Sequence, residues 1–234
     1  MPHWKQEQLQ QLIQEENQQK MFSTALSLAQ QLGMEFLGYR LTGRPLVEGP
    51  QVVLFNNYPS AWNEHYQRNE YQRTDPTILH CHRSTMPVLW TEELYTDAPQ
   101  IRQMAQEHGL RHGWSQGTQD LRGNQSVLCV SRQHGDVSMA ELYEKSAQTL
   151  WLCNLLHTLM VTKLHPPRGS VFSLSARERE VLKWTAAGKT AEDISCILTL
   201  SRSTVNFHIR SVTSKLNTTN KTSAVAIATL HGLI

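Results

Sequence analysis

The sequence predicts an α+β protein, in which an N-terminal α/β/α sandwich is followed by an all-α helix-turn-helix domain of four helices. Residues 1–165 mix helical and strand-like hydrophobic patterns, as a sheet covered by helices requires. Pro166-Pro167 interrupts this pattern, and the residues beyond it form short helical patterns joined by tight turns. With 234 residues, the chain is long enough for two domains that each bury a core.

The first 57 residues predict two helices and two strands. The Gln-rich segment Gln6–Gln19 places its aliphatic residues at helical spacing, which favours a solvated amphipathic helix over disorder. Met21–Leu32 reads as a second helix, and Gly33 is the residue type that commonly ends one. Residues 35–41 and 51–57 are rich in β-branched and aromatic side chains and are predicted strands.

The next segment, NYPSAWNEHYQRNEYQRTDP at residues 57–76, contains four polar-tipped rings. Pro59 fits a first helical position, where its missing N–H needs no partner, so a helix is predicted from Pro59 to Tyr71. On this helix Trp62 and Tyr66 share one face. That face is either an ordinary amphipathic stripe on a core or the wall of a binding site. Each buried Tyr O–H or Trp N–H needs a hydrogen-bond partner, which a ligand can supply.

Three more strands are predicted, at residues 87–90, 112–117 and 125–131. Between the first and second of these, a helix is predicted from Glu92 to His108 with Gly109 as its cap. Gly123-Asn124 is a suitable hairpin turn between the last two strands.

A long helix is predicted to follow, running to Leu164. Ser138 and Glu141 have the spacing of a capping box at its start. Its apolar side chains are numerous enough to cover a sheet and a partner subunit: Leu142, Leu150, Trp151, Leu155, Leu156 and Leu159.

A linker is predicted at residues 166–172, because Pro166-Pro167 stops the preceding helix and Gly169-Ser170 loosens the chain after it. The two domains are therefore predicted at 1–165 and 173–234. No run approaches the 18 apolar residues of a membrane span, and the N-terminus has no signal-peptide core, so a cytoplasmic protein without a membrane partner is predicted. The four cysteines stand far apart and suggest neither a disulfide framework nor a zinc site.

The C-terminal domain carries the most specific pattern in the chain. Ser175 and Glu178 form a capping box for its first helix, and a second helix is predicted at Ala191–Leu198. After a short turn, Ser201 is the N-cap of a third helix that extends to Leu216. Two helices joined by a tight turn form a helix-turn-helix, whose second helix enters the major groove of DNA.

Charge supports a polyanionic partner for this domain. Residues 1–165 hold 13 Lys and Arg against 16 Asp and Glu, a formal charge of −3, whereas residues 166–234 hold 9 against 4, or +5. No acidic residue follows Asp193. The outward face of the third helix is expected to carry Arg202, Ser203, Asn206, Arg210 and Ser214. Arg and Asn pair with guanine and adenine edges, whereas Lys189, Lys215 and Lys221 suit phosphate contacts.

This region resembles the helix-turn-helix domain of the LuxR family of transcription regulators. The resemblance rests on Glu178, Leu182, the segment WTAAGKT and the segment TVNFH. Together with the charge pattern, it predicts the following DNA-binding residues: Lys189, Thr190, Arg202, Ser203, Thr204, Asn206, Arg210, Lys215 and Lys221. Response regulators driven by phosphorylation share this output domain, so it leaves the input signal undecided.

The N-terminal segments NYPSAWNEHYQRNEYQRTDP, PVLW and GLRHGW resemble the acyl-homoserine-lactone sensor domain of quorum-sensing LuxR regulators. The resemblance implies that Trp62 donates to the lactone carbonyl, Asp75 accepts from the ligand amide, and Tyr58 donates to the acyl carbonyl. Tyr66 and Trp90 would form the walls around the head-group. Such donors and acceptors satisfy the dipoles of a ligand enclosed by apolar side chains.

The acyl tail is expected among the aliphatic side chains Val52, Leu54, Val127 and Leu128. Cys129 stands where the family usually has a hydroxyl, and a thiol is a weaker donor. Gln116-Gly117 also departs from the apolar residue and Pro that related sensors carry. The sequence therefore leaves the acyl chain length and its 3-position substituent open.

The combined resemblance predicts a ligand-dependent transcription regulator of quorum sensing and no enzyme activity. It implies a homodimer that binds a palindromic promoter site and contacts RNA polymerase. Activation of transcription is the expected outcome, while the sequence leaves the choice between activation and repression open. N-acyl-homoserine lactone would be its signal ligand, with no cofactor. The histidines at 80 and 82, and at 108 and 112, are poorly placed for a metal, so no metal site is predicted. The alternatives are a lactone-binding or lactone-hydrolysing enzyme and a phosphorylation-driven response regulator; neither a nucleophile elbow nor a receiver-type acidic pair is found.

Overall fold

The computed structural model describes residues 4–43, 51–164 and 172–234. The chain divides into two compact units near residue 166, and each is described here by itself. The linker predicted at 166–172 lies outside the described residues except for Phe172. Among the described helices, none has the length and apolarity needed to cross a membrane.

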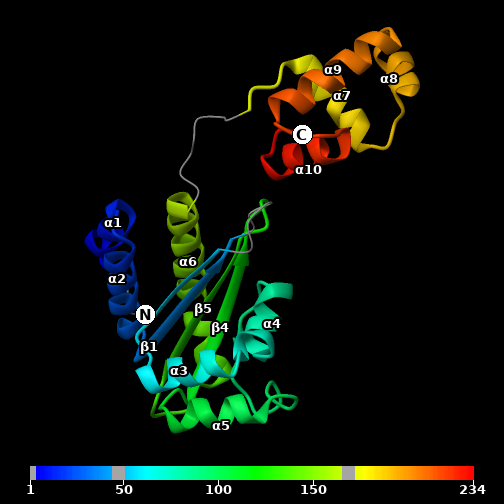
Figure 1. Cartoon of the computed structure of the whole chain (residues 1–234). Coiled ribbons are helices and arrows are strands. Elements are labelled where there is room, and N and C mark those ends of the chain that lie inside the picture. The colour runs from blue at the N-terminus through cyan, green and yellow to red at the C-terminus, as the bar shows by residue number, and fades with distance from the viewer. Residues whose placement is uncertain (1–3, 44–50, 165–171) are drawn as a thin grey trace. The chain divides into compact units, whose positions relative to one another are not determined.

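Unit 1 contains a five-stranded antiparallel sheet with the strand order β2-β1-β5-β4-β3 (Figure 1). Its strands are β1 (Phe36–Thr42), β2 (Val52–Asn56), β3 (Val88–Leu89), β4 (His112–Gln119) and β5 (Gln125–Arg132). All five predicted strands are confirmed, each to within about two residues at its ends.

Helices cover both faces of this sheet, as the predicted α/β/α sandwich requires. One face is covered by α2 (Gln18–Gln31) and α6 (Met139–Leu164), with α1 (Gln6–Gln14) against α2. The opposite face is covered by α3 (Ser60–Arg68), the short 3-10 helix η1 (Tyr71–Arg73), α4 (Pro76–Arg83) and α5 (Pro99–Glu107).

The two faces follow from the alternation of side chains along each strand. Trp114 and Leu128 point to the α6 side, where they are almost completely buried in the largest core cluster. Their neighbours Ser115 and Cys129 point to the α3–α5 side. The register sets Asn56, Gly38, Cys129 and Ser115 in one row across four strands.

Several predicted boundaries are wrong, each for a local reason. The Gln6–Gln19 helix is broken because the side chain of Asn17 accepts from the Lys20 N–H and starts a new helix, α2. Pro59 is the N-cap of α3 and not its first residue, and the helix ends before the left-handed Glu70.

The predicted helix 92–108 also begins late. Residues 92–97 form turns, and α5 starts at Pro99 because proline disfavours helical geometry at the residue before it. The β4–β5 connection is a five-residue loop, 120–124, in which the carboxylate of Asp120 accepts from the N–H groups of Arg122 and Asn124. Gly123 supplies the positive φ of 81° that this loop needs.

Unit 2 is the predicted bundle of four helices: α7 (Ala176–Ala186), α8 (Ala191–Leu198), α9 (Arg202–Lys215) and α10 (Lys221–Leu230). The Ser175–Glu178 capping box and the Ser201 N-cap are both confirmed. Thr199 adopts a left-handed conformation in the turn between α8 and α9. Val205, Val212 and Leu216 face inward and fix the rotation of α9, so its polar residues face outward.

Candidate ligand pocket and nucleic-acid interface

A cavity of about 100 Å³ lies between the sheet of unit 1 and the helices α3, α4 and α5. All six residues predicted to bind a ligand line it: Tyr58, Trp62, Tyr66, Asp75, Trp90 and Cys129. They come from separate elements, with Trp62 and Tyr66 on α3, Asp75 at the start of α4 and Cys129 on β5. Further lining residues include Gly38, Arg40, Asn56, Thr77 and Tyr95.

Asp75 is the buried anionic group of this cavity. It is the N-cap of α4, and its Oδ1 accepts from the N–H and the hydroxyl of Thr77, at 2.9 and 2.7 Å. Its Oδ2 accepts from the hydroxyl of Tyr66 at 2.9 Å. Burial raises the pKa of Asp75, while these hydrogen bonds oppose that shift. Each carboxylate oxygen keeps capacity to accept from a ligand N–H.

The two tryptophans of the cavity differ in the state of their indole N–H. Trp90 donates to the hydroxyl of Ser115 at 2.9 Å. Trp62 is 95% buried, yet its N–H donates to no group in the part of the chain that the structure describes. An unpaired donor on a buried side chain that lines the cavity favours a ligand acceptor as its partner.

Cys129 belongs to a chain of polar groups that crosses the cavity wall. Its sulfur lies 3.1 Å from the hydroxyl oxygen of Ser115, and Tyr58 lines the same cavity. Burial raises the pKa of Cys129 to about 12, so the thiol is neutral and is no reactive nucleophile. Trp90, Ser115 and Cys129 therefore orient one another.

Gly38 on β1 allows Tyr58 to take its place. A Cβ at position 38 would overlap the hydroxyl of Tyr58, so only glycine leaves room for the ring to lie across the strand. Gly38 and Ser115 were not among the predicted site residues. Gly38 could have been identified from the sequence, because a glycine inside a predicted strand often marks a close approach of another group. Ser115 could not, because the sequence does not show which residue faces Trp90.

Two of the four predicted tail residues line the cavity and two do not. Leu54 and Val127 are lining residues. Leu128 points to the opposite face of the sheet, because adjacent strand residues alternate, and lies in the α6 core. Val52 is 46% exposed at the edge strand β2 and is absent from the lining. Gln116 likewise faces away, with its side-chain nitrogen donating to the Thr85 carbonyl at 2.6 Å.

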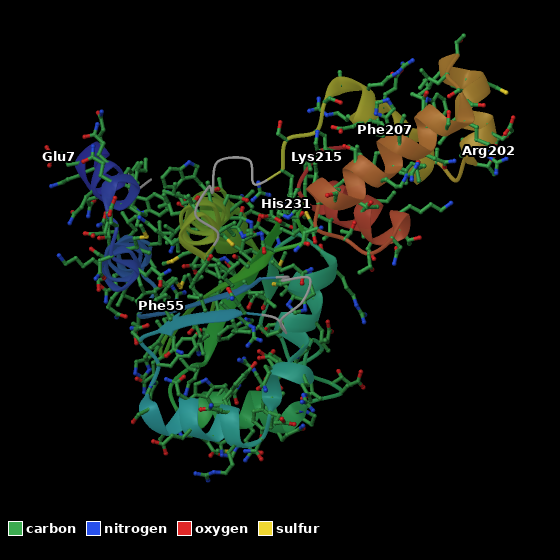
Figure 2. The ribbon with its side chains drawn as sticks, turned by 45° about the horizontal axis from the view of Figure 1, so that its top comes forward. Glu7, Phe55, Arg202, Phe207, Lys215 and His231 are labelled. Atoms are coloured by element: carbon green, nitrogen blue, oxygen red, sulfur yellow. The ribbon has the colours of Figure 1, made fainter. Side chains whose placement is uncertain are left out.

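In unit 2, the predicted DNA-contacting face of α9 is exposed. Arg202, Ser203, Asn206, Arg210 and Ser214 all lie on it, as the sequence predicted. Figure 2 shows the side chains of Arg202 and Lys215 towards opposite ends of this helix. Lys189 and Lys221 are also exposed.

Lys215 has a partner within the domain that the sequence did not indicate. Its Nζ lies 2.7 Å from the carboxylate of the buried Glu178, which also accepts from the hydroxyl of Ser211 and the N–H of Ser175. Although burial acts in the opposite direction, these bonds lower the pKa of Glu178 to about 2. Lys215 therefore ties α9 to α7, in addition to any role at a phosphate.

Thr190 and Thr204 also serve the fold. Thr190 is the N-cap of α8 and exchanges hydrogen bonds with Asp193. Thr204 is tied to the N-cap Ser201. The described residues contain no group of three or more His, Cys, Asp or Glu side chains placed to hold a metal ion.

Two protein families match the chain, one for each unit. Residues 17–160 match the autoinducer binding domain family, and residues 172–228 match the luxR family of bacterial regulatory proteins. The first match covers the sheet and the cavity, and the second covers the helix-turn-helix.

Several known proteins match both units of this chain over most of their own length. The transcriptional activator SolR of Ralstonia solanacearum is 37% identical over 223 residues, covering 94% of each chain. The quorum-sensing regulator RhlR of Pseudomonas aeruginosa is 33% identical over 217 residues, covering 92% of this chain and 90% of its own. The structure of SdiA in complex with octanoyl-rac-glycerol superposes with a TM-score of 0.71 and 28% identity, covering 96% of this chain and 93% of SdiA.

Proposed function

This chain belongs to the LuxR family of transcription regulators, and on that basis we propose that it is a receptor for an N-acyl-homoserine lactone. The observation that carries this proposal is that Trp62, whose N–H has no partner among the described residues, and the hydrogen-bonded carboxylate of Asp75 line one cavity. A lactone and an amide separated by a short spacer offer one acceptor and one donor to that pair. The aliphatic Leu54 and Val127 would then contact the acyl chain.

In this arrangement, Trp62 donates to the lactone carbonyl and Asp75 accepts from the amide N–H. Tyr58 donates to the acyl carbonyl, while Tyr66 and Trp90 pack around the head-group. Each role matches the free hydrogen-bonding capacity of the residue, because Trp90 already donates to Ser115 and Tyr66 to Asp75. Cys129 would lie beside the amide or the acyl carbonyl.

The proposed receptor acts in the cytoplasm as a homodimer on a palindromic promoter site, and it activates transcription by assisting RNA polymerase. A general property of the motif and one feature of the structure support this. A helix-turn-helix commonly reads two half-sites through a dimer, and α6 exposes Tyr143, Leu150 and Trp151 on one side. SolR is named an activator, which favours activation here as well.

The test of ligand binding uses the full chain and a panel of N-acyl-homoserine lactones with 1-octanoyl-rac-glycerol as a competing class. Trp62→Phe removes the indole donor and is expected to weaken lactone binding by about two- to twelvefold, the effect of one hydrogen bond. Trp184→Phe, on α7 in unit 2 and outside the cavity, is the matched control and should bind as the wild type does.

Isothermal titration of each variant measures the change. Equal lactone affinities for wild type and Trp62→Phe would exclude the proposed head-group position. If octanoyl-glycerol binds and no lactone does, the proposed class of ligand is wrong, although the cavity can still be the binding site.

A further inference from the structure

Phe207 is a large apolar side chain on the outer face of α9, and 62% of its surface is exposed. The other large aliphatic residues of this helix behave differently: Val205 and Val212 are buried, and Ile209 packs against the core. Packing inside the domain therefore gives no reason for a phenylalanine at this position. Figure 2 shows Phe207 between Arg202 and Lys215 along the helix.

The surroundings of Phe207 are polar or cationic. Ser203 and Arg210 lie one turn before and after it on the helix, and Asn206 adjoins it; all three are exposed. No Asp or Glu occurs on α9 or after it. An apolar protein partner would meet an arginine and two polar side chains around a single ring, whereas DNA offers phosphates and base edges to the same residues.

The position of Phe207 in the helix agrees with a base contact. Ser201 is the N-cap of α9, so Phe207 is the sixth helical residue, on the second turn. In a helix-turn-helix, the N-terminal part of the second helix faces the base edges in the major groove. The apolar group that the four bases present there is the 5-methyl group of thymine.

We propose that Phe207 recognises the 5-methyl group of a thymine in each half-site of the operator, and so determines part of the sequence specificity. Arg210 and Asn206 beside it are placed to hydrogen-bond to neighbouring base edges or phosphates. Phe207 then selects thymine over cytosine, which has an amino group and no methyl group at the corresponding edge.

The experiment first selects binding sites from random DNA with the full chain, expressed in the presence of N-hexanoyl-homoserine lactone. In the selected site, each thymine is then replaced singly by deoxyuridine, which lacks only the methyl group. We expect one replacement per half-site to weaken wild-type binding by about fourfold, the effect of one buried methyl-sized group. For Phe207→Ala, the same replacement should change nothing.

Two further variants separate this contact from general effects. Phe207→Leu keeps an apolar side chain and should keep some sensitivity to the methyl group. Arg210→Ala should weaken binding and still respond to deoxyuridine as the wild type does. Thermal melting of each variant checks folding, which an exposed side chain should not disturb.

Four results would overturn the proposal. One is a wild-type protein that is insensitive to deoxyuridine at every thymine, and another is Phe207→Ala with unchanged sensitivity. The third is Phe207→Ala with wild-type DNA binding but no transcription from a reporter, which would assign the ring to a protein contact. The fourth is a wild-type protein that, saturated with a lactone that it binds in the titration, selects no DNA sequence, which would mean that α9 does not read bases.

Discussion

At the residue scale, the absence of a side chain at Gly38 determines where Tyr58 lies. We expect Gly38→Ala to displace the Tyr58 ring, because the new Cβ would overlap its hydroxyl. The sheet should remain intact, since the clash is with the end of a side chain and not with backbone. Loss of the Tyr58 donor should weaken lactone binding by about two- to twelvefold.

A double-mutant cycle checks this mechanism by isothermal titration. Tyr58→Phe removes the same hydroxyl directly. If Gly38 acts through Tyr58, the double variant should bind no more weakly than the weaker single variant. Additive losses would show that Gly38→Ala disturbs the cavity in another way.

Cys129 provides a second prediction at this scale. Cys129→Ser places a stronger donor beside Ser115 and Tyr58, and it should strengthen binding of 3-oxo lactones by about two- to twelvefold. Unsubstituted lactones of equal chain length should gain less, because burial of the hydroxyl carries a penalty without an acceptor. Paired dose-response curves measure the difference.

The matched control for this change is Cys153→Ser. Cys153 is also buried, but it lies on α6, on the opposite face of the sheet. It should lower stability without changing ligand preference. If Cys129→Ser shifts the dose-response curves of both ligand types equally, the side chain at position 129 only packs against its neighbours and does not contact the 3-position of the ligand.

Sequence patterns could identify which residues form the cavity, but not the face of the sheet to which every strand side chain points. The six residues predicted to bind a ligand do line the cavity. They could be predicted because the resemblance to a known domain supplied their roles. Leu128 was assigned to the tail and instead lies in the α6 core. Strand alternation was visible in the sequence, but which of the two faces holds the cavity was not.

At the scale of helices, Glu178 connects α7 to α9. Glu178→Gln keeps the shape and removes the charge that Lys215 and Ser211 bind, so we expect unit 2 to lose about 1.5–3 kcal/mol of unfolding free energy at pH 7. DNA affinity should fall too if α9 shifts. Glu180→Gln is the control, because Glu180 is half-exposed on the same helix and its pair with Arg177 should contribute little.

The pH dependence gives this prediction a second measurement. Since the folded pKa of Glu178, about 2, lies below its ordinary value of 4.5, the folded state favours the carboxylate. Its stabilisation is complete above pH 4.5 and is lost as the pH falls towards 2. Thermal melting against pH should therefore show wild type and Glu178→Gln converging below pH 4.5, and parallel curves would contradict this account.

Helix boundaries were less predictable than helix existence. The pattern indicated a helix at 92–108, but Pro99 governs its start because proline restricts the residue before it. Helix α4 had no predicted boundaries, although Asp75 followed by Pro76 is a clear start signal in retrospect. Local propensity and tertiary packing compete most closely at such ends.

At the scale of the whole molecule, we predict that the exposed side of α6 forms the dimer interface. Tyr143, Leu150 and Trp151 are 67%, 40% and 41% exposed. Leu150→Asp should convert a dimer into a monomer in analytical ultracentrifugation, because it places a charge within an apolar contact. Gln100→Asp, exposed on α5 and away from α6, is the control. A dimer that survives Leu150→Asp would place the interface elsewhere.

The sequence by itself indicated the division near residue 166, the five strands, most of the helices and the basic face of α9, while the family came from the resemblance of its motifs to a known one. These features of the fold depend on local periodicity, caps and charge, which neighbouring residues encode. Only the tertiary structure decided that Gly38 seats Tyr58, that Ser115 orients Trp90 and that Lys215 binds Glu178. Such contacts join residues 20 to 37 positions apart, and their geometry follows from strand register and helix packing, which no local pattern specifies.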